Sequence, residues 1–92
     1  MLKKLSEKEV QIRLADLDDW TYDGEAIERH WEFLDFSEAM DFINMVAVIA
    51  QEQNHHPQIV NLYNQVSLRL WTHTANGVTG KDIDMAMIID KL

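Results

Sequence analysis

Two runs of alternating residues constrain the fold of this chain more than any other feature. Over residues 26–33, and again over 66–71, largely apolar positions alternate with mostly polar ones. A period of two indicates a β-strand that buries one face and leaves the other in water. Asp23–Gly24 precedes the first run, and this pair predicts a tight hairpin turn in which both residues take positive φ.

Each run has a shorter strand beside it in the sequence. Residues 20–22 lead into the Asp-Gly turn, and residues 59–62 lead into a second turn at Tyr63–Asn64. We expect the strand after this second turn to end near His73, before a loop at Asn76–Gly77. The sequence therefore predicts two β-hairpins.

Three segments have helical spacing. The first runs from about residue 7 to 17 behind a capping box formed by Ser6 and Glu9. Ser37 is the expected cap of the second, which should end near Asn54 or His55. The expected buried positions of this second helix are Ala39, Met40, Ile43, Val46, Ala47 and Ala50. Its end is set by Pro57, which disfavours the α conformation in the residue before it.

The third helix begins at Thr79, with Asp82 three residues further on, and its expected apolar side is Ile83, Ala86 and Met87. The order is helix, two strands, helix, two strands, helix. This order predicts an α+β fold with a four-stranded antiparallel sheet and three helices packed on one face. With 92 residues the chain is expected to form one domain, residues 1–92, whose modest core makes oligomerisation an accessible source of further burial.

The charge and the residue types present exclude several kinds of function. Sixteen acidic and eight basic residues give a net charge of −8, which repels phosphate backbones and argues against direct nucleic-acid binding. The absence of cysteine rules out disulfides, thiolate zinc sites and a cysteine nucleophile, and suits a cytoplasmic protein. The stretch 36–50 is too short and too polar to span a membrane, and no signal peptide follows the first lysines.

Three of the four histidines fall in the region where helix and strand ends are expected to meet. His55 and His56 precede Pro57, and the second hairpin can return His73 towards them. Histidine suits proton transfer because its ordinary pKa is about 6.5. A histidine at a helix C-terminus, or beside a carboxylate, could act as a general acid near neutral pH.

Each of these residues also has a purely structural interpretation. The His55–His56 pair could simply cap a helix, His73 could be a surface strand residue, and Asp82 could serve only Thr79 as a cap. Trp20 and Trp71 could pack in the core or at an interface, and His30 fits a solvated charge cluster. A zinc site is disfavoured because adjacent histidines at a helix end diverge and no H-E-x-x-H pair is present.

A set of spaced motifs resembles the pterin-4a-carbinolamine dehydratase family. The set comprises Asn54-His55-His56-Pro57, Tyr63-Asn64-x-Val66, Thr72-His73, Gly77 and Lys81-Asp82, with Trp20 and the strand up to Phe36 also similar. The resemblance covers nearly the whole chain and implies the same α+β fold. It implies a cofactor-free lyase that dehydrates 4a-hydroxytetrahydropterin to quinonoid dihydropterin and water, during tetrahydropterin recycling.

The resemblance also implies roles for individual residues. His55 and His73 correspond to the acid–base pair, His56 to a residue that holds and polarises the pterin, and Asp82 to a carboxylate supporting the site near His73. Pro57 and Trp20 join His56 as expected substrate-binding residues, and no metal ligand is implied. One position departs from the family, because Gln51 stands where an acidic residue is usual and the acid is next to it at Glu52.

Other functions and partners remain open. Relatives form dimers or tetramers, so we expect at least a dimer. One alternative is a binding or dimerisation module that regulates a partner, such as an aromatic amino-acid hydroxylase or a transcription factor. Another is a role on a pterin-like compound linked to molybdenum cofactor metabolism. The presence of His55, His56 and His73 together favours the enzyme.

Overall fold

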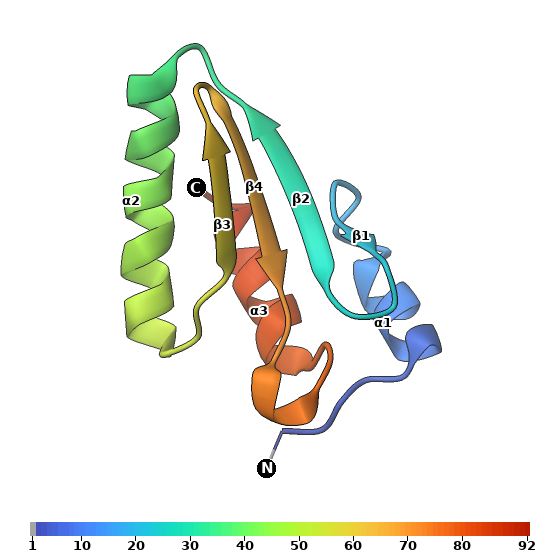
Figure 1. Ribbon diagram of the computed structural model, residues 1–92. Helices are drawn as coiled ribbons and strands as arrows, with labels where there is room; N and C mark the ends of the chain where they lie inside the picture. Colours follow the sequence, from blue (N-terminus) through green and yellow to red (C-terminus); the bar gives the residue numbers. More distant parts are fainter. Residues whose placement is uncertain (1) are drawn as a thin grey trace.

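The computed structural model describes residues 2–92 and contains three α-helices and one four-stranded sheet (Figure 1). In chain order the elements are α1 (Glu7–Leu14), β1 (Thr21–Tyr22), β2 (Ile27–Glu32), α2 (Phe36–Gln53), β3 (Gln58–Leu62), β4 (Gln65–Leu70), a 3-10 turn (His73–Ala75) and α3 (Gly80–Ile89). Every strand pair is antiparallel and the strand order is β1-β2-β4-β3. The predicted α+β fold, with its helices on one face of the sheet, is confirmed.

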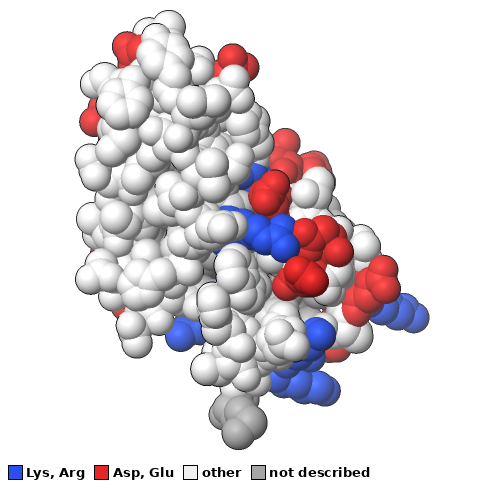
Figure 2. Space-filling model, in the orientation of Figure 1, with Lys and Arg blue, Asp and Glu red and all other residues white. Residues whose placement is uncertain are grey.

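Alternation along the two central strands separates the faces of the sheet. In β4, Val66, Leu68 and Leu70 are fully buried, whereas the residues between them are more exposed. The register aligns Ile27 of β2 with Leu70, which places it on the same helix-covered face. In Figure 2 charged groups gather over one side of the molecule, while the side formed by α2 is almost uncharged.

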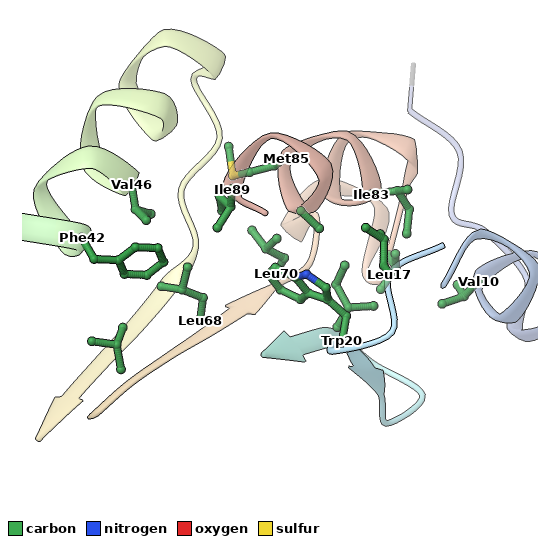
Figure 3. Close-up of a cluster of buried hydrophobic side chains, with 14 of the residues drawn as sticks. Val10, Leu17, Trp20, Phe42, Val46, Leu68, Leu70, Ile83, Met85 and Ile89 are labelled. Atoms are coloured by element: carbon green, nitrogen blue, oxygen red, sulfur yellow. The ribbon is translucent and has the colours of Figure 1, made fainter. Parts of the chain in front are cut away.

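The core lies between the sheet and the helices (Figure 3). Figure 3 shows Leu68 and Leu70 of β4 facing Phe42 and Val46 of α2 and Met85 of α3. Burying each of these large apolar side chains contributes about 1.5–3 kcal/mol. No helix within residues 2–92 has both the length and the apolar character needed to cross a membrane.

The predicted positions on the helices are partly wrong. In α2, Phe42 is buried and Ala47 is exposed, and in α3 the buried positions include Met85 rather than Met87. Each helix carries more apolar residues than its buried face can hold. Helical spacing alone therefore did not determine which of them face the core. Some remain exposed for this reason, including Met45 and Val48 of α2.

Two helix boundaries also differ from the prediction. The capping box of Ser6 and Glu9 is present, but α1 ends at Leu14 instead of near residue 17. The acidic residues 16, 18 and 19 that follow are unfavourable at the negative end of a helix. The helix α2 is capped by Asp35 rather than Ser37, because the Asp35 carboxylate accepts the N–H of Glu38 at 2.9 Å.

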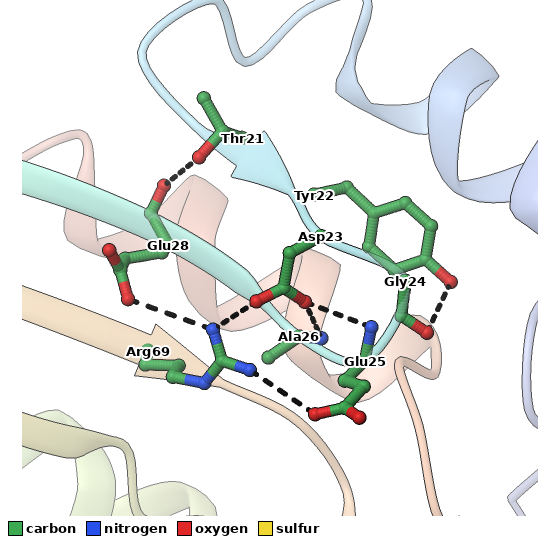
Figure 4. Close-up of polar contacts among 8 residues, drawn as sticks. All are labelled: Thr21, Tyr22, Asp23, Gly24, Glu25, Ala26, Glu28 and Arg69. Carbon is green, nitrogen blue, oxygen red and sulfur yellow. Dashed lines mark hydrogen bonds and ion pairs between the residues drawn. The ribbon is translucent and has the colours of Figure 1, made fainter.

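The turn between β1 and β2 is built around the side chain of Asp23 (Figure 4). Its Oδ1 accepts the backbone N–H groups of Glu25 and Ala26 at 2.9 and 3.0 Å, and its Oδ2 contacts the Arg69 guanidinium at 2.5 Å. Gly24 has a φ of 97°, but Asp23 does not have positive φ. The predicted tight Asp-Gly turn is therefore wrong, and a longer side-chain-capped turn takes its place.

Replacing Asp23 with asparagine should remove a pH-dependent part of the stability. The hydrogen bond from Arg69 holds the pKa of Asp23 at about 2, below its ordinary 3.8. Because the folded-state pKa is depressed, the ionised carboxylate stabilises the fold above about pH 4, and this contribution is lost as the pH falls through 2. Asp23 is half exposed, so we expect a difference below about 1 kcal/mol.

Urea unfolding of the wild type and of Asp23→Asn, each at about pH 5 and about pH 2, measures this contribution. Asparagine keeps an acceptor oxygen for the two backbone N–H groups, so the turn is retained. The wild type should lose more stability than the variant on acidification. An equal loss in both proteins would show that the Asp23–Arg69 pair contributes nothing.

Candidate active site

The C-terminal end of α2 positions the first two histidines. Asn54 adopts the left-handed conformation, with a φ of 49°, and the N–H of His55 donates to the carbonyl of Ala50 at 3.1 Å. This ends the helix as Pro57 predicts. The chain then turns directly into β3, so His55 and His56 lie where a helix and a strand meet.

A fully buried carboxylate binds His55. Asp82, in the first turn of α3, has no exposed surface, and its Oδ1 lies 2.5 Å from Nε2 of His55. Its Oδ2 accepts the hydroxyl of Thr72 at 2.8 Å and the backbone N–H of Thr79 at 2.9 Å. Asp82 is therefore both the predicted capping partner of Thr79 and a partner of His55. The resemblance placed it near His73, but it reaches that residue only through the neighbouring Thr72.

The hydrogen bonds around Asp82 fix the direction of the protons. A carboxylate only accepts, so His55 presents an N–H at Nε2, which leaves Nδ1 as the second ring nitrogen available for a ligand. The Thr72 hydroxyl donates to Asp82, so the Thr79 hydroxyl, 2.8 Å away, donates to Thr72. The network is buried and fully paired, and such a network holds its members in one arrangement.

His56 has a different and uncharged partner. Its Nε2 lies 2.7 Å from Oε1 of Gln51, one turn back on α2. The amide oxygen accepts, so Nε2 donates and the opposite nitrogen, Nδ1, is an acceptor when the ring is neutral. Gln51 keeps a hydrogen bond at the position where the resemblance implied an acid. The two adjacent histidines are thus oriented by a carboxylate and by an amide.

The third histidine comes from the segment after β4. This strand ends at Leu70, earlier than predicted, and His73 begins the 3-10 turn. The imidazole of His73 lies against the ring of Trp71, with centroids 4.7 Å apart and planes inclined by 31°. The segment is held by the pairing of Thr72 with Gly77, beside the left-handed Asn76.

One cavity of about 420 Å³ brings the three histidines together. Its lining residues are Leu2, Asn54, His55, His56, Trp71, Thr72, His73, Thr74 and Lys81. They come from the N-terminal segment, the end of α2, the segment after β4 and the start of α3. A cavity of this size suits a small organic ligand.

Two of the predicted substrate-binding residues lie elsewhere. Trp20 is buried in the core, where its indole Nε1–H donates to Asp90 at 2.9 Å, and it does not line the cavity. Pro57 follows His56 but is not among the lining residues either. His30 lies on the open face of the sheet, beside Ser67, as its polar neighbours predicted.

The cavity also contains residues that sequence reasoning missed. Trp71 was interpreted as a packing or interface residue, although it is a large aromatic residue on the otherwise polar side of its predicted strand, a signal that pointed to a ligand surface. Asn54 and Lys81 belong to the motifs that resemble the family, but no role was assigned to them, because polar residues are common at helix ends.

The geometry suits acid–base chemistry on a bound planar ligand. Three imidazoles can accept or donate protons, one is positioned by Asp82, and Trp71 offers an aromatic wall. Within residues 2–92, no three histidine, aspartate or glutamate side chains converge as metal ligands.

Comparison with known proteins identifies similar chains across the full length. The family model described as pterin 4 alpha carbinolamine dehydratase matches residues 3–92. A relative in Burkholderia orbicola, named as a pterin-4-alpha-carbinolamine dehydratase, is 47% identical over 92 residues, covering 98% of this chain and 90% of the relative. A relative of the same name in Sulfurisphaera tokodaii is 43% identical over 91 residues, covering 99% and 98%.

A solved structure has the same fold. The crystal structure of a transcriptional coactivator/pterin dehydratase from Brucella melitensis superimposes with a TM-score of 0.91. The two sequences are 43% identical, and the alignment covers 97% of each chain.

Proposed function

This chain belongs to the pterin-4a-carbinolamine dehydratase family, and we propose that it dehydrates 4a-hydroxytetrahydropterin by histidine acid–base catalysis. Members of this family are hydro-lyases, which eliminate water by breaking a carbon–oxygen bond. The observation that carries the mechanism is the convergence of His55, His56 and His73 on one cavity, with His55 bound to the buried carboxylate of Asp82.

The reaction requires one proton to be added and another to be removed. The C4a hydroxyl is a poor leaving group, so an acid protonates its oxygen and the C4a–O bond breaks to release water. A ring N–H then loses its proton, and the electron pair forms the C=N bond of quinonoid dihydropterin. A positioned acid and a positioned base each contribute about 10²–10⁴-fold.

The histidines divide these tasks. His55 and His73 are the proposed acid–base residues, since they come from separate segments that line the same cavity, and two groups are needed for the two proton transfers. His56 is proposed to hold and polarise the pterin through the ring nitrogen that Gln51 leaves free. Asp82 is a positioning residue, because it acts through His55.

The substrate is itself the product of an oxygenation, so this reaction follows that step. A 4a-hydroxy adduct forms when a hydroxylase uses a tetrahydropterin to activate oxygen, and the quinonoid product needs a reductase to regain its reduced form. We propose that the protein serves in this recycling. The test is the ultraviolet absorbance change as freshly generated 4a-hydroxytetrahydropterin is dehydrated. The protein should accelerate the reaction above its spontaneous rate, and the spontaneous rate alone would refute the proposal.

We also propose that the chain forms at least a dimer through β3 and α2. The strand β3 lies at the edge of the sheet, and its Val60 and Leu62 are 56% and 78% exposed. Met45 and Val48 of α2 add exposed apolar surface. An unpaired apolar edge strand is prone to pair with another chain.

Light scattering tests this association. The wild type should have at least twice the 10.8 kDa mass of one chain, and Val60→Lys together with Leu62→Lys should lower the mass. Ile12→Lys is the matched control, because Ile12 is 63% exposed on α1, away from β3 (Figure 1). A wild-type mass of one chain would contradict the proposal.

A second role, as a module that binds another protein, would use the same exposed apolar residues of β3 and α2. The similar structure from Brucella melitensis carries both a coactivator and a dehydratase name. If these residues serve only this role, the Val60 and Leu62 variants will leave both the mass and the dehydratase rate unchanged.

A further inference from the structure

The charge lining the cavity is opposite in sign to the charge of the protein as a whole. The chain carries 16 acidic and 8 basic residues, yet within residues 2–92 no aspartate or glutamate lines the cavity. Asp82 lies behind His55 and has no exposed surface. Among the described lining residues, Lys81 is the only lysine or arginine.

Lys81 has a free ammonium group. It is the second residue of α3 and is half buried, and its backbone N–H donates to the Thr79 hydroxyl at 3.3 Å. Within residues 2–92 no carboxylate lies within ion-pair distance of its side chain, whereas Arg29 and Arg69 are each paired with aspartates. Its charge is therefore available to a ligand.

Two further lysines belong to the same end of the molecule. Leu2 lines the cavity, and Lys3 and Lys4 follow it directly. The N–H of Leu5 donates to the carbonyl of Val78 at 2.8 Å, and the Lys4 side chain lies over Gly77, so close that a Cβ there would be 2.6 Å from its Cε. The N-terminal segment thus runs along the loop that follows His73.

We propose that the cavity selects pterins whose side chain ends in an anionic group, phosphate or carboxylate, and that Lys81 is the residue that selects them. This inference rests on the proposed dehydratase function. The pterin ring is uncharged and is served by the histidines, so the unpaired ammonium group complements the side chain rather than the ring. A cavity of about 420 Å³ lies in the range that holds a small ligand together with its substituent.

The test compares three 4a-hydroxytetrahydropterins that differ only in the side chain. One ends in neutral hydroxyls, one in a phosphate and one in a carboxylate. The measured quantity is kcat/KM for each, in the wild type and in Lys81→Gln, with Lys91→Gln, just beyond the C-terminal end of α3, as the matched control. Removing a cation from the first turn of a helix does not weaken the helix, so Lys81→Gln should fold normally.

We expect Lys81→Gln to lower kcat/KM for an anionic pterin about tenfold, with little change for the neutral one. Lys81→Arg should restore the preference, and Lys91→Gln should not alter it. A loss for the phosphate or the carboxylate pterin alone identifies which anion is selected. An unchanged ratio of anionic to neutral substrate in Lys81→Gln would overturn the inference and leave the dehydratase intact. A wild type inactive on all three pterins would instead refute the proposed function.

Discussion

Replacing Asp82 with asparagine is expected to lower kcat by about 10²–10⁴-fold while the protein remains folded. Three donors converge on this buried carboxylate, namely His55 Nε2–H, the Thr72 hydroxyl and the Thr79 N–H. Asparagine has one acceptor oxygen and one NH₂ group, so at least one donor must face another donor. If the amide oxygen stays with Thr72 and Thr79, His55 is driven into the opposite tautomer and its reactive nitrogen is no longer presented correctly.

The alanine variant separates positioning from folding. Asp82→Ala removes all three acceptor contacts, one of which is the Asp82 half of the capping box of α3, so we expect it to lose about 3–5 kcal/mol of stability. Asp82→Asn should lose less stability, because its oxygen can still accept the Thr79 N–H. Turnover and urea unfolding are measured for both variants. Full activity in a folded Asp82→Asn protein would show that the carboxylate serves the structure alone.

The second large effect is expected at His55 and His73. Replacing either by alanine should lower kcat by about 10²–10⁴-fold, because each is proposed to supply or remove a proton in the transition state. The double variant should be little worse than the more damaging single variant, since residues that act as a unit are not additive. His30→Ala is the control, because His30 lies on the open face of the sheet outside the cavity.

A loss of folding must be distinguished from a loss of catalysis at His55. His55→Ala leaves the buried Asp82 carboxylate without one of its partners, which can destabilise the protein by several kcal/mol. His55→Gln supplies an N–H₂ group to Asp82 but cannot exchange a proton near neutral pH. A folded, inactive His55→Gln protein supports the acid–base role, and a folded, active one argues against it.

Local signals in the sequence predicted most of the fold. Alternation identified the central strands, the Ser6–Glu9 and Thr79–Asp82 pairs marked two helix starts, and Pro57 marked the end of α2. These features act over a few residues, through side-chain alternation, side-chain caps and the restricted backbone before proline, so they can be recognised locally. The Asp23 turn was mispredicted because the Asp23 side chain accepts the N–H groups of Glu25 and Ala26, which stabilises a longer turn than the Asp-Gly pair alone suggests.

The site was harder to predict than the fold because its parts are joined by contacts between distant segments. The convergence of His55 and His73 was expected from the hairpin, and the cavity contains both. The contact between His55 and Asp82 spans 27 positions and was not predicted, and neither was the place of Lys81 in the cavity wall. Trp20 packs in the core, which was one of its interpretations from the sequence, and does not line the cavity as the resemblance implied.

The most direct test of the central claim is the rate of 4a-hydroxytetrahydropterin dehydration after treatment with a chelator. Ultraviolet absorbance would follow the wild type and the His55→Ala/His73→Ala double variant side by side. Acceleration by the chelator-treated wild type, with only the spontaneous rate in a folded double variant, is the predicted result. A wild type that loses its activity with the chelator, or a double variant that retains activity, would contradict histidine acid–base catalysis.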